Sequence, residues 1–268
     1  MRLHIQHETL YRYERPIKYS VQRLHLTPRP EPSQRVIAWR LEAPGSRVEQ
    51  LDAHGNVTHL LTIEDARREI CISVRGIVDT SEQDLSPEDG PLSPLAYLAE
   101  TPLTRADPQL RAFAGDACAG RTSAEAIAHD LCEAICATIR YRPGSSEVGD
   151  SASAAFAARA GVCQDQAHVF LACARARGLP ARYVSGYLYT GDASEVASHA
   201  WVDVWLGAEL GWRSLDVTHR RPAQGRYCRL AVGRDYLDAA PVRGVRHGGG
   251  DERLAARVQV AGSAQEQQ

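Results

Sequence analysis

Alternating apolar and polar positions dominate the first eighty residues, which is the period of half-buried β-strands. One parity of the opening stretch holds the side chains expected to face inward: Leu3, Ile5, His7, Thr9, Tyr11 and Tyr13. Further strand-like runs occur at 35–42, 57–63 and 69–78, and His54-Gly55-Asn56 supplies turn residues between two of them. This spacing predicts a small antiparallel β domain, sandwich-like, over residues 1–82.

The hydrophobic period becomes helical after residues 80–94, an acidic stretch rich in proline and serine that is typical of a linker. An apolar stripe over 124–139 predicts one amphipathic helix, and a second is expected from about 163 to 177. Strand-like runs follow this second helix at 181–190, 199–206 and 211–217. The order predicts an α+β core domain over 83–262, followed by a polar tail at 263–268.

Composition narrows the possible functions. The 268 residues carry 31 basic and 33 acidic side chains, a net charge of −2, which gives no general attraction for nucleic acids or anionic membranes. No apolar run approaches the roughly 18 residues of a membrane span, and the first residues lack the apolar core of a secretory signal. Seven cysteines, an odd number, fit reduced thiols better than a disulfide framework. We therefore expect a cytoplasmic protein without nucleic-acid or membrane partners; its oligomeric state is open.

Cys163 is the first candidate for chemistry. It opens the second helix, two residues after Gly161. Free N–H groups and the positive end of the helix dipole favour the thiolate form that attacks carbonyl groups. Most free cysteines are nevertheless small buried hydrophobes, so placement alone leaves both interpretations open.

His199 and Asp216 supply the groups that a nucleophilic cysteine needs. His199 begins one strand-like run and Asp216 ends the next. If a hairpin through residues 207–210 joins the two runs, the start of one strand lies beside the end of the other. The carboxylate could then orient the imidazole as a base for Cys163. An ordinary strand-end histidine and a solvated aspartate are the alternatives.

Together these residues resemble the bacterial transglutaminase-like family. The segments that carry the resemblance are Gly161-Val162-Cys163-Gln164-Asp165, Arg177-Gly178-Leu179-Pro180-Ala181-Arg182, Ser198-His199-Ala200-Trp201-Val202, Gly211-Trp212 with Asp216, Tyr11-Arg12-Tyr13, Gln22–Arg29 and Val232–Tyr236. The resemblance implies a papain/transglutaminase-like core in which the nucleophile helix packs on an antiparallel sheet. It assigns Cys163 as nucleophile, His199 as base and then acid, and Asp216 as the orienting carboxylate.

Two positions depart from the pattern of that family. Gln166 stands where relatives often carry an aromatic residue, and the segment from Asp216 to His219 replaces a more usual Asp-Pro-Thr-Asn. Neither change removes a member of the triad. Both leave the shape of the pocket open.

Acyl transfer also requires donors for the developing oxyanion. The backbone N–H of Cys163 is one by its place at a helix N-terminus. Tyr141 and Gln164 are candidates for the second, although Tyr141 as a core aromatic and Gln164 pointing away are equally consistent with the sequence. We expect Trp201 to wall the cleft beside His199. His168 lies five residues after Cys163 and is expected to be structural.

A metal site is the remaining alternative. His129, Cys132 and Cys136 share one helical face, but no fourth ligand stands at a suitable spacing, so core packing is the better interpretation. A zinc-stabilised interaction domain would contain stoichiometric zinc. We expect neither a metal nor an organic cofactor.

The sequence thus predicts a cysteine-dependent acyl-transfer enzyme that acts on peptide, isopeptide or glutamine-type amide bonds of a peptide or protein substrate. The resemblance favours hydrolysis, as in a protease or amidase. The alternatives are a transglutaminase, which transfers the acyl group to an amine, and a non-catalytic protein-binding module that keeps the fold.

Overall fold

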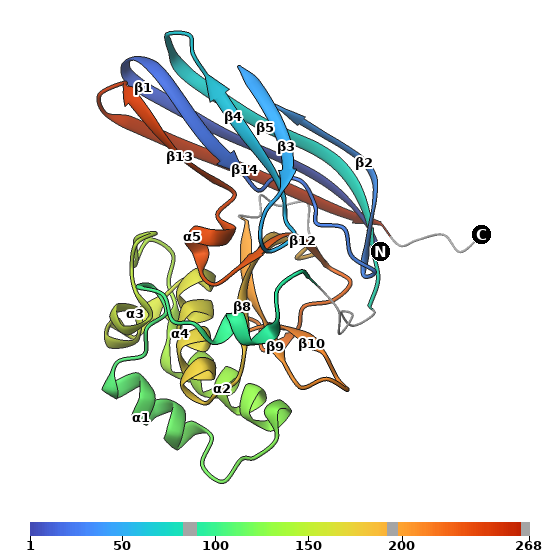
Figure 1. Ribbon diagram of the computed structural model, residues 1–268, viewed down its shortest axis with the longest axis vertical. Coiled ribbons are helices and arrows are strands. Elements are labelled where there is room, and N and C mark those ends of the chain that lie inside the picture. The colour runs from blue at the N-terminus through green and yellow to red at the C-terminus, as the bar shows by residue number, and fades with distance from the viewer. Residues whose placement is uncertain (83–89, 192–197, 264–268) are drawn as a thin grey trace, which may run out of the picture.

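The computed structural model describes residues 1–82, 90–191 and 198–263, and shows two parts, each built around its own antiparallel sheet (Figure 1). The N-terminal sheet has the strand order β2-β5-β1-β4-β3, with β13 and β14 also paired to β1. Its strands are β1 (Arg2–Leu24), β2 (Gln34–Glu42), β3 (Ser46–Leu51), β4 (Val57–Ile63), β5 (Arg67–Thr80), β13 (Val242–Gly248) and β14 (Glu252–Ser263). Residues 83–89, the middle of the predicted linker, lie outside the described ranges.

The long strand β1 organises this sheet. Its first half alternates as predicted, with Leu3 and Ile5 almost fully buried, and it lies between β5 and β14. The register shifts around residues 12–19, after which Ser20, Gln22 and Leu24 face inward and the strand lies between β4 and β13. Because one strand serves both halves, the strands form a single sheet. The sandwich-like packing stays a prediction, and the sheet extends beyond residues 1–82 because it includes β13 and β14.

The C-terminal segment returns to the N-terminal sheet. β14 pairs with β1 from Arg2↔Ser263 to Tyr13↔Glu252, and Val258 and Val260 complete the apolar core of that sheet. The α+β core domain expected to extend to residue 262 therefore ends near residue 241. Residue 263 belongs to β14, and the rest of the predicted polar tail, 264–268, lies outside the described residues.

The second part is the α+β core, in which helices pack on one side of a sheet of order β11-β10-β9-β8-β12 (Figure 1). Helix α4 lies against β8 and β9, and α1, α2 and α3 pack around α4. The elements are η1 (Pro94–Leu98), α1 (Pro108–Ala117), α2 (Ala124–Thr138), β6 (Arg140–Tyr141), α3 (Ala152–Ala158), β7 (Ala160–Gly161), α4 (Cys163–Ala176), β8 (Ala181–Leu188), β9 (His199–Trp205), β10 (Trp212–Asp216), β11 (Arg221–Pro222), β12 (Tyr227–Gly233) and α5 (Tyr236–Ala239). The predicted helix and strand order of the core is confirmed.

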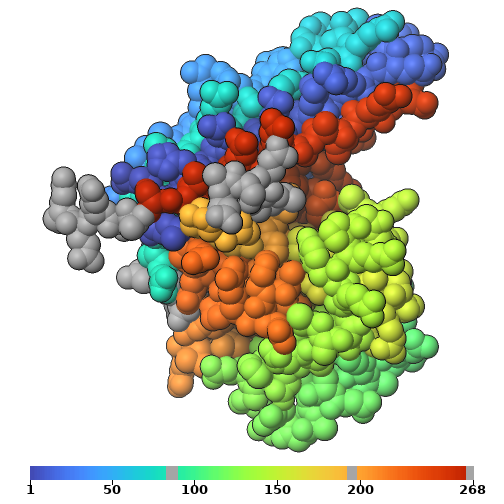
Figure 2. Space-filling model, turned by 180° about the vertical axis from the view of Figure 1, so that it is seen from behind, coloured from blue at the N-terminus to red at the C-terminus, as the bar shows by residue number. Residues whose placement is uncertain are grey.

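Apolar and ionic contacts join the two parts. Tyr187, Cys228 and Leu230 of the second sheet belong to the hydrophobic core of the first. The fully buried Asp203 is bonded to Arg182 and Arg229, and Arg229 reaches Glu31 of the N-terminal part at 3.1 Å. Seen from behind, the orange strands of the core lie directly beneath the sheet and against the green helices (Figure 2). None of the helices in the described ranges is long and apolar enough for a bilayer crossing.

Candidate active site

Cys163 is the first residue of the buried helix α4, as the sequence predicts. Its helix N-terminus is capped by Asp165, whose Oδ2 accepts hydrogen bonds from the Val162 N–H at 2.7 Å and from the Ser146 hydroxyl at 2.6 Å. A Cβ on Gly161 would lie 2.5 Å from the Cβ of Asp165, so this tight turn requires glycine. The half-buried thiol therefore lies at the N-terminus of α4, where the first backbone N–H groups have no partner within the helix.

His199 and Asp216 meet as expected from a hairpin of β9 and β10. The two strands are antiparallel, and Nε2 of His199 lies 2.8 Å from Oδ2 of Asp216. Because Nε2 is engaged with this carboxylate, Nδ1 is the ring nitrogen left for Cys163, whose interaction with the imidazole helps to raise the pKa of His199. The structure thus brings together the three residues that the sequence singled out.

The electrostatics of the pair favour a charged imidazole. Burial alone lowers the pKa of His199, but hydrogen bonds to Asp216 and Cys163, together with their charges, raise it to about 9. Burial opposes ionisation of Asp216 as well, yet its hydrogen bonds to His199 and His219 hold the pKa of that carboxyl well below its usual range. The site is built to keep an imidazolium between a carboxylate and a sulfur atom.

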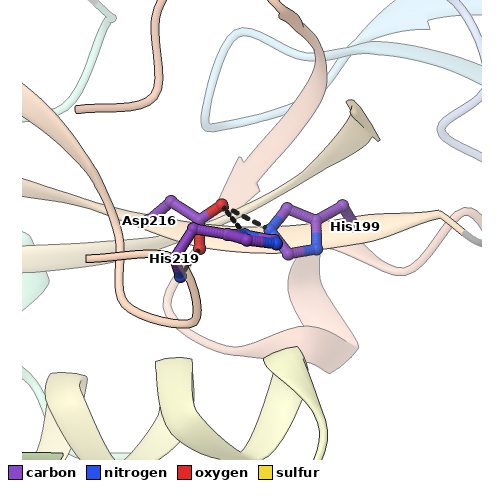
Figure 3. A group of neighbouring side chains, drawn as sticks. All are labelled: His199, Asp216 and His219. Atoms are coloured by element: carbon purple, nitrogen blue, oxygen red, sulfur yellow. Dashed lines mark hydrogen bonds and ion pairs between the residues drawn. The ribbon is translucent and has the colours of Figure 1, made fainter. Parts of the chain in front are cut away.

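Two further residues hold Asp216, and sequence reasoning assigned neither of them a role. Oδ2 also accepts a hydrogen bond from Nδ1 of His219 at 2.7 Å (Figure 3). The Tyr227 hydroxyl donates to the same oxygen at 2.7 Å, and Oδ1 accepts a hydrogen bond from the His219 backbone N–H. His219 stands three residues after an aspartate that ends a strand, a spacing from which a turn contact can be anticipated. Tyr227 is the first residue of β12, and no motif near it in the sequence indicates a contact with Asp216.

The predicted cleft residues are placed differently from one another. Tyr141 lies beside Gly161 in the β6–β7 pair and is 51% exposed; burial of its ring and the nearby Cys163 raise the pKa of its hydroxyl. Gln164 donates its side-chain N–H to the Val148 carbonyl at 3.0 Å, so it does not point at Cys163. Trp201 is 1% exposed and stacks on His199 with ring centroids 6.3 Å apart, which makes it the backing of the imidazole.

The two positions that depart from the family pattern are linked to each other. The buried Gln166 donates to the Ile139 carbonyl at 2.9 Å and accepts from the Thr218 hydroxyl at 2.7 Å. It therefore ties α4 both to the end of α2 and to the turn after Asp216. His168 is fully buried, accepts the Tyr236 N–H, and has a pKa lowered by burial to about 4, which fits its expected structural role.

The metal alternative gains no support from the helix face that suggested it. The His129 side chain is 72% exposed, whereas Cys132 is buried in the core. Within the described ranges, the three potential ligands that do converge are His199, Asp216 and His219, whose ligand atoms lie within 4.8 Å of one another. Both histidines hydrogen-bond the same oxygen of this carboxylate, Oδ2 of Asp216.

Comparison with known proteins relates both parts of this chain to transglutaminase-like families. Residues 3–79 match the family described as the bacterial transglutaminase-like N-terminal region, and residues 111–217 match the transglutaminase-like superfamily. An uncharacterized protein of Mycobacterium tuberculosis is 33% identical over 91% of this chain and 87% of its own length.

Two further similarities concern proteins with a stated activity. A crystal structure of a candidate cysteine protease from Cytophaga hutchinsonii superimposes with a TM-score of 0.82 at 21% identity, over 100% of this chain and 92% of that one. A protein-glutamine gamma-glutamyltransferase of Pseudomonas aeruginosa is 35% identical over a shorter stretch, 37% of this chain and 17% of that protein. At these levels the first similarity establishes the fold alone.

Proposed function

This chain belongs to the transglutaminase-like superfamily, and from that premise we propose that it is a cysteine-dependent acyl-transfer enzyme acting on an amide bond of a peptide or protein. The observation that carries the proposal is the His199–Asp216 hydrogen bond beside Cys163 at a helix N-terminus. These are the three groups that thiol catalysis requires, with a base that is itself oriented.

The proposed reaction proceeds in two halves. The Cys163 thiolate attacks the carbonyl carbon, the C–N bond breaks, and the imidazolium of His199 gives its Nδ1 proton to the departing amine. The resulting thioester is then attacked by water or by a second amine, from which neutral His199 takes a proton. Asp216 keeps the ring oriented and stabilises its charge throughout. Cys163 is regenerated when the thioester C–S bond breaks.

We propose two donors for the oxyanion. The backbone N–H of Cys163 belongs to the first turn of α4, where such groups have no intrahelical partner. The Tyr141 hydroxyl is the second candidate, because its pKa responds to the nearby Cys163 and its ring is half exposed. Gln164 is the weaker candidate, since its side chain is engaged with Val148.

We favour hydrolysis over amine transfer as the second half-reaction. Tyr141 near Cys163 is 51% exposed, and the side chain of His219 beside Asp216 is 40% exposed, so water reaches the site next to both residues. Transfer to an amine needs a site that excludes water until the amine arrives. Transfer is the activity named for the similar Pseudomonas aeruginosa protein, and it is the alternative outcome of the same thioester.

The test of the proposal is alkylation of the cysteines by iodoacetamide as a function of pH, followed by peptide mass mapping. We expect Cys163 to react faster than the exposed Cys71 well below the usual thiol pKa of about 8.5, and to lose that advantage in His199→Ala. Cys163→Ala should abolish turnover of amide and isopeptide substrates. If Cys163 behaves as an ordinary thiol in both proteins, a binding module that keeps the fold becomes the better account.

A further inference from the structure

A cavity lies away from Cys163, between α2 and the β9–β10–β11 edge of the sheet. Its volume is about 440 Å³, within the range of pockets that hold small molecules. In Figure 2 this face is where the orange strands meet the green helices. Apolar side chains form part of its lining: Ala128, Cys132, Val204, Leu206, Leu215 and Pro222. Cys163 does not line it, so it is separate from the active site.

Basic side chains outnumber acidic ones around this cavity. Arg213, Arg220 and Arg221 line it together with Glu125 and Glu133. Arg220 lies 3.4 Å from Glu133, an exposed pair of little strength. The decisive residue is Arg221, which is half-buried and, within the described ranges, has no carboxylate partner. A guanidinium in that position leaves charge and N–H donors available for an anion.

We propose that this cavity binds a small amphipathic carboxylate. The anion would pair with Arg221 and Arg220, and a short apolar chain would lie along the surface formed by residues such as Val204 and Leu215. Arg220 has a left-handed backbone, at φ 52°, and both it and the next residue, Arg221, line the cavity. A polar head on one side and an apolar wall on the other are the features that select such a ligand.

The pocket is connected to the catalytic carboxylate by a short chain of contacts. Arg221 stands opposite Asp216 in the β10–β11 ladder and donates its Nε–H to the Tyr227 hydroxyl at 2.9 Å. Tyr227 in turn donates to Oδ2 of Asp216 at 2.7 Å. A bound anion competes for Arg221, which weakens the polarisation of the Tyr227 hydroxyl and its hydrogen bond to Asp216. Asp216 then holds imidazolium at His199 more strongly. This coupling, unlike the binding, rests on the proposed function.

The binding test is isothermal titration calorimetry of the full chain with octanoate, with octanol as the uncharged control and acetate as the control without an apolar chain. We expect octanoate to bind at least tenfold more tightly than either control. Arg221→Gln should weaken it at least tenfold, and Leu206→Trp should do so by filling the apolar side of the cavity. Arg253→Gln, an equal change of charge on an exposed strand, should leave it unchanged. Thermal unfolding checks that each variant is folded.

Two results would overturn the proposal: octanoate binding no better than octanol, or binding that neither folded pocket variant weakens. The coupling is tested separately, by the pH profile of Cys163 alkylation with and without octanoate. In the parent, we expect octanoate to shift the high-pH transition of the alkylation profile, which reports loss of the His199 proton, to higher pH. Octanoate should cause no such shift in Arg221→Gln. An unchanged profile in the parent would refute the coupling. Calorimetry repeated on Cys163→Ala reports binding even if the proposed acyl-transfer activity is wrong.

Discussion

Replacing Asp216 with asparagine tests the electrostatic argument most directly, because the side chain keeps its shape and loses its negative charge. The rise of the His199 pKa from 6.5 to about 9 corresponds to about 3 kcal/mol in favour of the imidazolium. A hydrogen bond between charged groups is worth about 1.5–3 kcal/mol, so the carboxylate supplies a large share of this stabilisation. Without the carboxylate, only Cys163 counteracts the lowering of the His199 pKa by burial, so this pKa must fall.

Asparagine also cannot reproduce the hydrogen bonds of the carboxylate. Oδ2 accepts three donors and Oδ1 accepts the His219 N–H, so either orientation of the amide turns its NH₂ group toward a donor. We therefore expect alkylation of Cys163 at pH 7 to slow by about 10- to 100-fold, the equivalent of about 1.4–2.8 kcal/mol. Turnover of an amide substrate should fall at least as much.

The assay is the rate of Cys163 modification by iodoacetamide between pH 5 and pH 10, with Cys71 of the same molecule as the reference thiol. Asp79→Asn is the matched control, since Asp79 is a nearly buried carboxylate bonded to Arg2 and Arg35 in the N-terminal sheet. It should leave the Cys163 profile unchanged. A folded Asp216→Asn protein with the parent's pH profile would refute the reasoning, because the imidazolium would then be held by something other than this carboxylate.

Other perturbations address neighbouring features. Because the raised pKa of His199 stabilises the fold fully below pH 6.5 and is lost as the pH rises through about 9, the melting temperature should decline over that interval more steeply in the parent than in His199→Ala. His219→Ala should lower kcat/KM by about 3- to 10-fold through loss of one hydrogen bond to the triad, and His219→Asn should recover part of it. Asp203→Asn should lower the free energy of unfolding in urea by about 3–5 kcal/mol, because the buried Arg182 and Arg229 both lose the carboxylate that they share. Gly161→Ala should displace Asp165 and remove the alkylation advantage of Cys163 while the protein stays folded by circular dichroism; an unchanged advantage would show that the turn tolerates a Cβ.

Local patterns predicted the parts of the site that depend on neighbouring segments. The contact between His199 and Asp216 could be expected because two strands joined by a short connection pair antiparallel, and this fixes which ends meet. Cys163 could be placed at a helix start because the apolar stripe begins there. The role of Asp165 as a cap follows from the same local geometry, because its carboxylate accepts from the N–H of Val162 three residues earlier.

What the sequence could not supply depends on contacts between distant segments. Tyr227 reaches Asp216 although its strand β12 pairs with β8 and is three strands away from β10 in the sheet, so no local pattern indicates the contact. β14 gave a weak signal, since Val258 and Val260 are the buried positions of a strand that is otherwise mostly exposed. A two-residue alternation does not indicate which sheet a strand will join, so the strand was assigned to the wrong part of the molecule.

The pairing of β1 with β14 has a consequence for synthesis on the ribosome. Residues 2–13 find one neighbour in β5, which is made early, but their other neighbour is residues 252–263. Until those residues emerge, the backbone N–H and C=O groups along one side of β1 remain unpaired, and such an open strand edge can recruit other nascent chains. The α+β core, made in between, can complete its own sheet first. The part of the chain that is translated first is thus among the last to be finished.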